Sequence, residues 1–143
     1  FGEVADLLRT RGVDFQRRSA LAGAWRVLLL DTVGELAEAY AGASLSFVGG
    51  TLAPVGGHNL LEPARCGIGI LVGPHTEHVA EGRARLEAAG GLQVVKDAAG
   101  LARTLKELSE DPARRSRMGE AALASAVTGV REALEAALTP FLT

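Results

Sequence analysis

The sequence predicts an α/β protein built on a doubly wound parallel β-sheet, with helices on both faces. Short apolar runs alternate along the chain with segments of helical length, which is the pattern of repeated βαβ units. The apolar runs are continuous, as expected for parallel strands that are buried on both faces. Because the sequence has no internal repeat and no low-complexity linker, we expect residues 1–143 to form a single domain.

The first part of the chain predicts a helix, a strand and a second helix. Apolar residues at helical spacing stop at Gly12, which predicts a helix over residues 1–12. The run WRVLLLD then predicts a buried strand over residues 26–30. The segment GELAEAYAGA predicts a short helix over residues 34–43.

The middle of the chain adds two strands around another short helix. The run SLSFVG predicts a strand over residues 45–49, and IGILVG predicts one over residues 69–72. Between them, LLEPARCG predicts a helix over residues 60–67 that Gly67 ends. Cys66 is expected on the buried side of this helix, as part of the core.

The remainder of the chain is mostly helical. Gly90 and Gly129 are each expected to end a helix. In chain order, the predicted elements are a helix over 78–90, a strand over 92–95 and helices over 98–111, 112–129 and 130–142.

The composition favours a soluble globular protein. Apolar residues make up 48% of the chain and charged residues 22%, and no apolar run approaches the roughly 18–20 residues of a spanning helix. The net charge of -2 argues against a nucleic-acid-binding domain. A single cysteine excludes a disulfide framework and fits a reducing compartment. Because the chain begins without methionine inside a predicted helix, we expect it to be a piece of a longer protein.

A glycine-rich segment leaves the end of the strand over 45–49 and leads into a helix. In doubly wound folds, ligands bind beyond the carboxyl ends of the strands. Glycines let backbone N–H groups approach a ligand closely, and a helix start favours anions. The segment lacks the dinucleotide-binding and P-loop motifs. It therefore predicts an anion site of another kind, for which the candidates are Gly49, Gly50, Gly56, Gly57 and Thr51, the last with a hydroxyl donor.

The start of the helix that follows has two interpretations. In the first, Asn59 is the N-cap and Glu62 reaches back as the second half of a capping box. In the second, Glu62 is the N-cap and Pro63 takes the favoured first helical position. Both registers stay open at this point, and so does the choice between a structural role and a ligand-binding role for Glu62.

Three histidines lie near this segment. His58 directly precedes the helix, and the neighbouring glycines favour a functional role for it. His75 and His78 lie on either side of Glu77, but this spacing lacks a third well-placed ligand. We therefore expect no metal site.

Four motifs occur in order between residues 31 and 76: DTxGEL, FVGGTL, GGHNxLEPA and GPHT. Together they resemble the 3-deoxy-D-manno-octulosonic acid (Kdo) transferases, and residues 97–122 also look like that family. The resemblance implies two Rossmann-like domains facing a cleft, the GT-B arrangement of glycosyltransferases. This chain resembles only the C-terminal half, which binds the nucleotide sugar.

The resemblance also implies an activity. Members transfer Kdo from CMP-Kdo to a lipid A precursor in lipopolysaccharide biosynthesis, by an inverting reaction without metal or other cofactor, at the cytoplasmic side of the inner membrane. The N-terminal half would supply the acceptor site, the membrane attachment and the catalytic base. The present chain is then expected to be soluble, to contain no catalytic residue, and to bind the donor without transferring it.

The resemblance assigns roles to individual residues. Glu62 would accept hydrogen bonds from the ribose hydroxyls of the donor. Six residues would hold its phosphate: Gly49, Gly50, Thr51, Gly57, His58 and Asn59. Three would lie against its cytosine: Thr32, Val33 and Gly34. The sequence departs from the family pattern at Glu77 and His78, where members often have asparagine and a large apolar residue.

Two other functions remain open from the sequence. One is the UDP-sugar-binding half of another GT-B glycosyltransferase. The other is a non-catalytic α/β domain that binds a ligand or regulates a partner, in which the glycines only make a tight connection. A preference for CMP over uridine nucleotides would separate these from a Kdo transferase.

Overall fold

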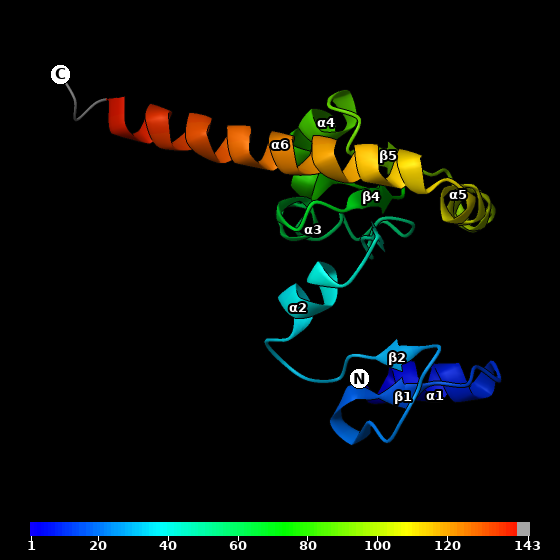
Figure 1. Ribbon diagram of the computed structural model, residues 1–143. Helices are drawn as coiled ribbons and strands as arrows, with labels where there is room; N and C mark the ends of the chain where they lie inside the picture. The colour runs from blue at the N-terminus through cyan, green and yellow to red at the C-terminus, as the bar shows by residue number, and fades with distance from the viewer. Residues whose placement is uncertain (140–143) are drawn as a thin grey trace. The chain divides into compact units, whose positions relative to one another are not determined.

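The structure is a computed structural model that describes residues 1–139 (Figure 1). It contains two compact units, Phe1–Ala39 and Tyr40–Thr143. Both contain helices and parallel strands, which confirms the predicted α/β class. The expectation of a single domain stays a prediction. Over the described residues, no helix combines the length and the apolar content needed to cross a membrane.

The first unit is built around two short parallel strands. Gln16 lies opposite Leu28 in their ladder, and the N–H of Gln16 donates to the carbonyl of Val27 at 3.0 Å. The elements are α1 (Gly2–Thr10), β1 (Gln16–Arg17), the 3-10 helix η1 (Arg18–Ala20) and β2 (Leu28–Leu29), followed by α2 (Leu36–Ala41), which crosses into the second unit.

The second unit holds a three-stranded parallel sheet in the order β3-β4-β5. Its elements are β3 (Leu45–Phe47), α3 (Leu61–Arg65), β4 (Gly69–Val72), the 3-10 helix η2 (Glu77–Val79), α4 (Ala80–Ala88), β5 (Leu92–Val94), α5 (Ala98–Glu110) and α6 (Pro112–Leu138).

The strand predicted over residues 26–30 is present as β2, but it lies in a different sheet from the other three predicted strands. It forms its ladder with β1, which the sequence did not predict. The reason is that β1 consists of two polar residues, Gln16 and Arg17, and so lacks the apolar run on which strand prediction depends.

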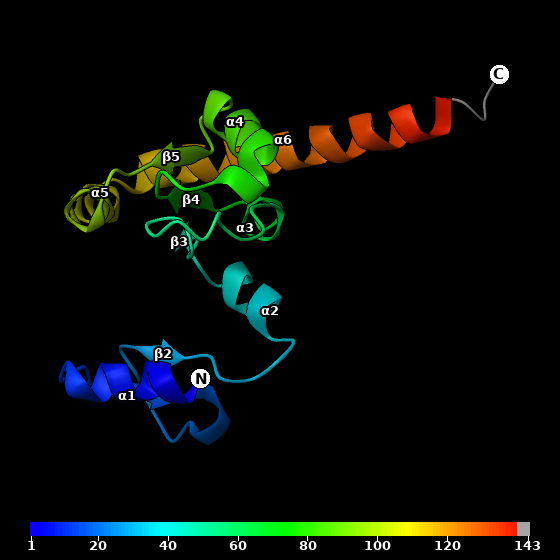
Figure 2. The same ribbon diagram turned by 180° about the vertical axis from the view of Figure 1, so that it is seen from behind.

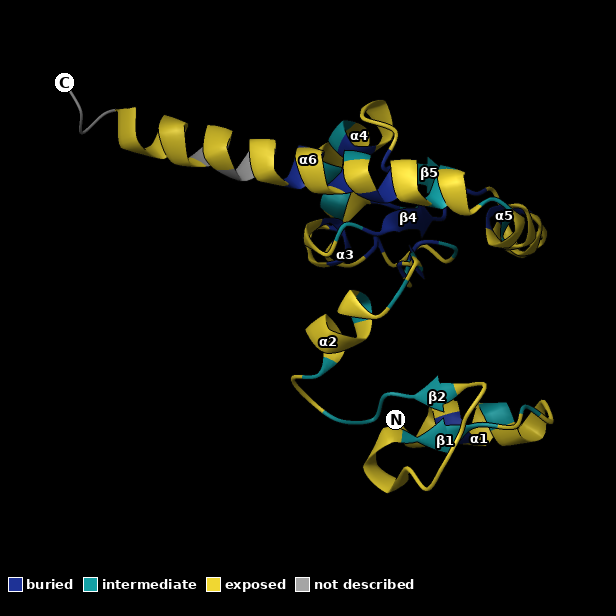
Figure 3. Ribbon diagram, viewed as in Figure 1, coloured by how far each residue is buried: buried dark blue, intermediate teal, exposed yellow. Residues whose placement is uncertain are grey.

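The central strand β4 is buried along its whole length (Figure 3). Its side chains alternate between two apolar clusters, as the pleat of a strand requires. Ile70 and Val72 belong to a cluster that includes side chains of α3, α4 and α6. Leu71 packs with Leu108 of α5 and Met118 of α6. Helices therefore cover both faces of this sheet, which confirms the doubly wound arrangement.

The last two long helices begin at aspartates. The carboxylate of Asp97 accepts the N–H of Gly100 at 2.7 Å, and that of Asp111 accepts the N–H of Arg114 at 2.8 Å. These are N-caps, which satisfy backbone donors that have no partner within the helix. Pro112 occupies the first turn of α6, where its missing N–H costs nothing.

Helix α6 contacts α3, α4, α5 and β4, as Figure 1 and the reverse view in Figure 2 show. It approaches the sheet closely at two glycines. A β-carbon on Gly119 would overlap the carbonyl oxygen of Gly67, and one on Gly91 would stand 2.6 Å from the backbone of Ala122. Neither position has room for a side chain, so the two backbones are in direct contact.

Two predictions about helices are wrong. The chain does not end a helix at Gly129, because α6 runs through it from Pro112 to Leu138. An interior glycine costs only about 1 kcal/mol, which a long helix tolerates. Cys66 is exposed rather than buried, because α3 ends at Arg65 and Cys66 belongs to the turn that follows. Residues 140–142 of the last predicted helix lie outside the described residues.

The close contact of α6 gives a stability prediction. Gly119→Ala should raise helix propensity by about 1 kcal/mol, yet the clash with Gly67 should outweigh this gain, since overpacking costs about 1–3 kcal/mol. We expect a lower free energy of unfolding in urea titrations. Gly82→Ala in α4 is the matched control, because a β-carbon there meets nothing within 4 Å. It should stabilise the chain by about 0.5–1 kcal/mol. Equal effects of the two changes would contradict this account.

Candidate functional site

Two connections meet at the carboxyl edge of the sheet in the second unit. The glycine loop, residues 48–59, leaves β3 and leads toward α3. The turn over residues 73–76 leaves β4, the adjacent parallel strand. Because β3 and β4 are parallel, both connections start from the same edge of the sheet, where ligands bind in doubly wound folds.

Thr51 joins the glycine loop to the turn. It is fully buried, its hydroxyl donates to the carbonyl of Val48 at 2.7 Å, and the same oxygen accepts the N–H of Gly73 at 2.8 Å. Its carbonyl accepts the N–H of His75 at 3.0 Å. The hydroxyl is therefore occupied within the fold, and the prediction that it donates to a ligand is wrong. The place of Thr51 in a binding loop stays a prediction.

The glycine loop bends sharply at Gly56 and Gly57, which have φ of 95° and 84°. Side chains rarely adopt this left-handed conformation, so glycine is required there. The N–H of Gly57 donates to the carbonyl of Gly50 at 3.0 Å and closes the loop, so this N–H is not free for a phosphate. In the described part of the chain, the N–H groups of Gly50, His58 and Asn59 bond to no other backbone group.

The helix start agrees with neither predicted register, because α3 begins at Leu61 and Leu60 occupies the N-cap position. The side-chain oxygen of Asn59 accepts the N–H of Leu61 at 2.9 Å, and Ala64 donates to the carbonyl of Leu60, so the first helical turn begins before Glu62. Glu62 does not reach the backbone of Asn59, as a complete capping box requires. Instead its carboxylate accepts the side-chain amide of Asn59 at 3.1 Å. Both side chains are exposed and could also contact a ligand.

Helix α3 contains five residues, fewer than the predicted span of 60–67. Such a short helix contributes only a small dipole, so any affinity for anions must come mainly from individual N–H groups. Gly49 is exposed at the start of the loop. His58 is exposed, and its ring lies next to Gly50, where a β-carbon would stand 3.1 Å from Nε2.

The other two histidines lie beyond the glycine loop. Nδ1 of His75 lies 3.5 Å from a carboxylate oxygen of Glu77. Within residues 1–139, no group of three or more histidine, cysteine, aspartate or glutamate side chains is arranged to hold a metal ion.

The three residues predicted to contact cytosine lie in the first unit, where they follow β2. Val33 is 92% exposed, and Gly34 has a left-handed φ of 92°. The hydroxyl of Thr32 donates to the carboxylate of Glu35. This bond and then the guanidinium of Arg18 hold the pKa of Glu35 below its usual range, against a partly opposing effect of burial. Val33 is therefore an exposed apolar side chain on a short turn, and its contact with cytosine stays a prediction.

Asp31 ties together the carboxyl ends of β1 and β2. Its carboxylate accepts the hydroxyl of Ser19 at 2.6 Å, the N–H of Ser19 at 2.9 Å and the guanidinium of Arg17 at 2.7 Å. The side chain of Asp31 is only 2% exposed. The two bonds from Ser19, and to a smaller extent Arg17, hold the pKa of Asp31 well below its usual range. This cluster has no local signal in the sequence, because Ser19 and Arg17 lie 12 and 14 residues from Asp31.

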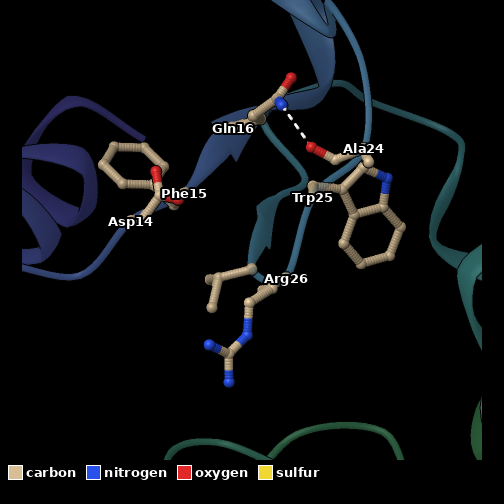
Figure 4. Close-up of a pocket in the computed structure, with 7 residues that line it drawn as sticks. Asp14, Phe15, Gln16, Ala24, Trp25 and Arg26 are labelled. Atoms are coloured by element: carbon tan, nitrogen blue, oxygen red, sulfur yellow. Dashed lines mark hydrogen bonds between the residues drawn. The ribbon is translucent and has the colours of Figure 1, made fainter.

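A separate pocket in the first unit is lined by residues 14–16 and 24–27 (Figure 4). The side chain of Gln16 donates to the carbonyl of Ala24 at 2.8 Å and accepts the N–H of Ala22 at 3.0 Å. It thereby holds the connection between β1 and β2. The pocket lies at the amino ends of these strands, opposite the end at which doubly wound folds bind ligands, and none of the predicted site residues lines it.

No protein-family model matches the chain. The 3-deoxy-D-manno-octulosonic acid transferase of Bordetella pertussis is 39% identical over 128 residues, which are 87% of this chain and 30% of that protein. The transferase of the same name from Haemophilus influenzae is 37% identical over 125 residues, 85% of this chain and 29% of that protein. The chain therefore spans less than a third of the length of these curated relatives.

A solved structure is also similar. It is the C-terminal CMP-Kdo binding domain of WaaA from Acinetobacter baumannii, with a TM-score of 0.75 and 27% sequence identity. The match covers 89% of this chain and 66% of that one.

The buried carboxylate of Asp31 predicts that the stability of the first unit depends on pH. Because the folded state lowers the pKa of Asp31, its contribution to stability is complete above the ordinary pKa of 3.8 and is lost as the pH falls toward the folded value. Asp31→Asn should therefore lower stability at pH 7 and remove the part of the acid sensitivity that Asp31 causes. Urea unfolding at pH 7 and pH 3, followed by Trp25 fluorescence, measures both, since Trp25 is the chain's single tryptophan.

Asp6→Asn is the control for this measurement, because Asp6 pairs with Arg9 on the surface and its side chain is 75% exposed. It should change little at either pH. An Asp31→Asn variant with the same pH dependence as the unmodified chain would contradict the assignment.

Proposed function

The chain is related by sequence and by fold to the 3-deoxy-D-manno-octulosonic acid (Kdo) transferases, and on this premise we propose that it is their CMP-Kdo-binding part, the Rossmann-like C-terminal half of a GT-B glycosyltransferase. The observation that carries the proposal is the glycine loop. It leaves the carboxyl edge of a parallel sheet, is closed by the bond from Gly57 to Gly50, and contains backbone N–H groups that bond to no other backbone group in the described part of the chain.

The proposed chemistry places the developing charge at this loop. When the glycosidic bond of CMP-Kdo breaks, CMP leaves and its phosphate gains negative charge. The N–H groups of Gly50, His58 and Asn59 are the candidate donors to that phosphate. Donors held in place before the reaction stabilise such charge without reorganising, and one of them contributes about 3 kcal/mol in other enzymes.

The rest of the proposed reaction requires more than this chain. Transfer to a lipid A precursor with inversion needs an acceptor site and a base, which we assign to an N-terminal half acting at the cytoplasmic side of the inner membrane. The chain is proposed to bind the donor and not to transfer it alone. An assay with CMP-Kdo and a lipid A precursor should then yield no product.

Calorimetry with CMP and UMP tests the function. We expect CMP to bind more tightly, because the turn at Thr32, Val33 and Gly34 is proposed to lie against cytosine. Tighter binding of UMP would instead support a glycosyltransferase half that uses UDP-sugars. Binding of neither nucleotide would support a non-catalytic α/β domain.

Glu62→Gln tests the proposed ribose contact. An ionised carboxylate that accepts hydrogen bonds contributes about 1.5–3 kcal/mol, so we expect CMP affinity to fall by about 10- to 100-fold. The melting temperature should barely change, because glutamine retains an acceptor for the amide of Asn59. Glu110→Gln is the control, since this exposed glutamate ends α5. Unchanged affinity in Glu62→Gln would leave Glu62 with a role in the helix start alone.

A further inference from the structure

His78 is a residue to which the family motifs assign no role, since the motif GPHT ends at Thr76. Its ring lies directly against the glycine loop. A β-carbon on Gly56 would stand 2.5 Å from Nδ1 of His78 and 2.6 Å from Cε1. The imidazole therefore fills the space that a side chain at position 56 would occupy.

Two further contacts from this segment support the bend at Gly56 and Gly57: one from the backbone of His78 and one from the side chain of Val79. The N–H of His78 donates to the carbonyl of Gly56 at 3.0 Å. A β-carbon on Gly57 would stand 3.2 Å from Cγ2 of Val79, so this side chain covers the second residue of the bend. His78 and Val79 belong to η2, which continues into α4, and Leu86 anchors α4 in the core with 1% of its surface exposed. The glycine loop is therefore supported by η2 and α4, which are anchored in the core.

We propose that His78 is a positioning residue of the candidate site, whose imidazole holds the bend at Gly56 and Gly57 by packing. The proposal rests on the function proposed above. The bend directly precedes His58 and Asn59, so its conformation sets the direction of their N–H groups. Removal of the ring leaves space beside Gly56 into which the bend can move. Binding then loses the preorganisation of these donors, although His78 itself contacts no ligand.

The test uses three variants of the chain. His78→Ala removes the ring, and His78→Phe keeps a ring of similar shape without its nitrogens. His75→Ala is the matched control, because Nδ1 of His75 lies 3.5 Å from a carboxylate oxygen of Glu77, while the backbone N–H of His75, which bonds to Thr51, is retained. All three leave the backbone bond from residue 78 to Gly56 in place. Thermal melts establish that each variant is folded.

Two readouts are measured on each variant. The first is hydrogen exchange of the Gly57 amide without ligand, which reports whether its bond to the carbonyl of Gly50 persists. The second is CMP affinity by calorimetry. For His78→Ala we expect faster exchange at Gly57 and a loss of about tenfold in CMP affinity, which corresponds to about 1.4 kcal/mol. His78→Phe and His75→Ala should both stay close to the unmodified chain in exchange at Gly57 and in CMP affinity.

Three results would overturn the proposal. Unchanged exchange at Gly57 in His78→Ala would show that the ring does not hold the bend. Losses in His78→Phe equal to those in His78→Ala would show that the ring nitrogens act, rather than packing. An equal loss in His75→Ala would indicate general loosening of the turn. If the unmodified chain binds no CMP, the proposed function fails, while exchange at Gly57 still decides whether His78 positions the loop.

Discussion

The buried hydroxyl of Thr51 is the interaction on which the candidate site depends. It bonds to the carbonyl of Val48 and to the N–H of Gly73, and so joins the connections that follow two adjacent strands. A β-carbon on Gly73 would overlap the carbonyl of Thr51, so the contact also requires glycine on the opposite side. A buried polar group without partners is costly, and here each partner satisfies the other. The start of the glycine loop is therefore held in place at Thr51, ahead of the bend at Gly56 and Gly57.

The second unit is organised from the inside outward. A fully buried strand, β4, lies at its centre, and its alternating side chains divide the core into two clusters. The long helix α6 contributes to both, and it can do so because Gly91 and Gly119 allow backbone contact with the helix. Such close packing holds the sheet edge steady. Loops on a rigid scaffold can then keep N–H groups in place for a ligand, which is a condition for strong binding of a phosphate.

The first unit depends on charge instead of apolar burial. Ala5 is its one buried hydrophobic residue within the described chain, and its two strands contain only two residues each. The small apolar core is supplemented by Asp31, which follows β2 and accepts hydrogen bonds from Arg17 in β1 and from Ser19 just after β1. An ionised carboxylate with several donors forms strong, directional bonds. These bonds tie down the residues just before Thr32, Val33 and Gly34, the turn for which a nucleobase contact is proposed.

The sequence by itself determined the fold class, three strands of the main sheet and the position of the glycine loop, because apolar runs and glycines are local signals. It could not place β1, which is polar, the bonds of Asp31, or the bond between Thr51 and Gly73, because the partners in these bonds lie 12 to 22 residues apart. Tertiary structure decided that the Thr51 hydroxyl is buried, that the helix begins before Glu62, and that His78 lies against Gly56. Each of these outcomes depends on which segments meet in space, and a residue's neighbours along the chain do not specify that.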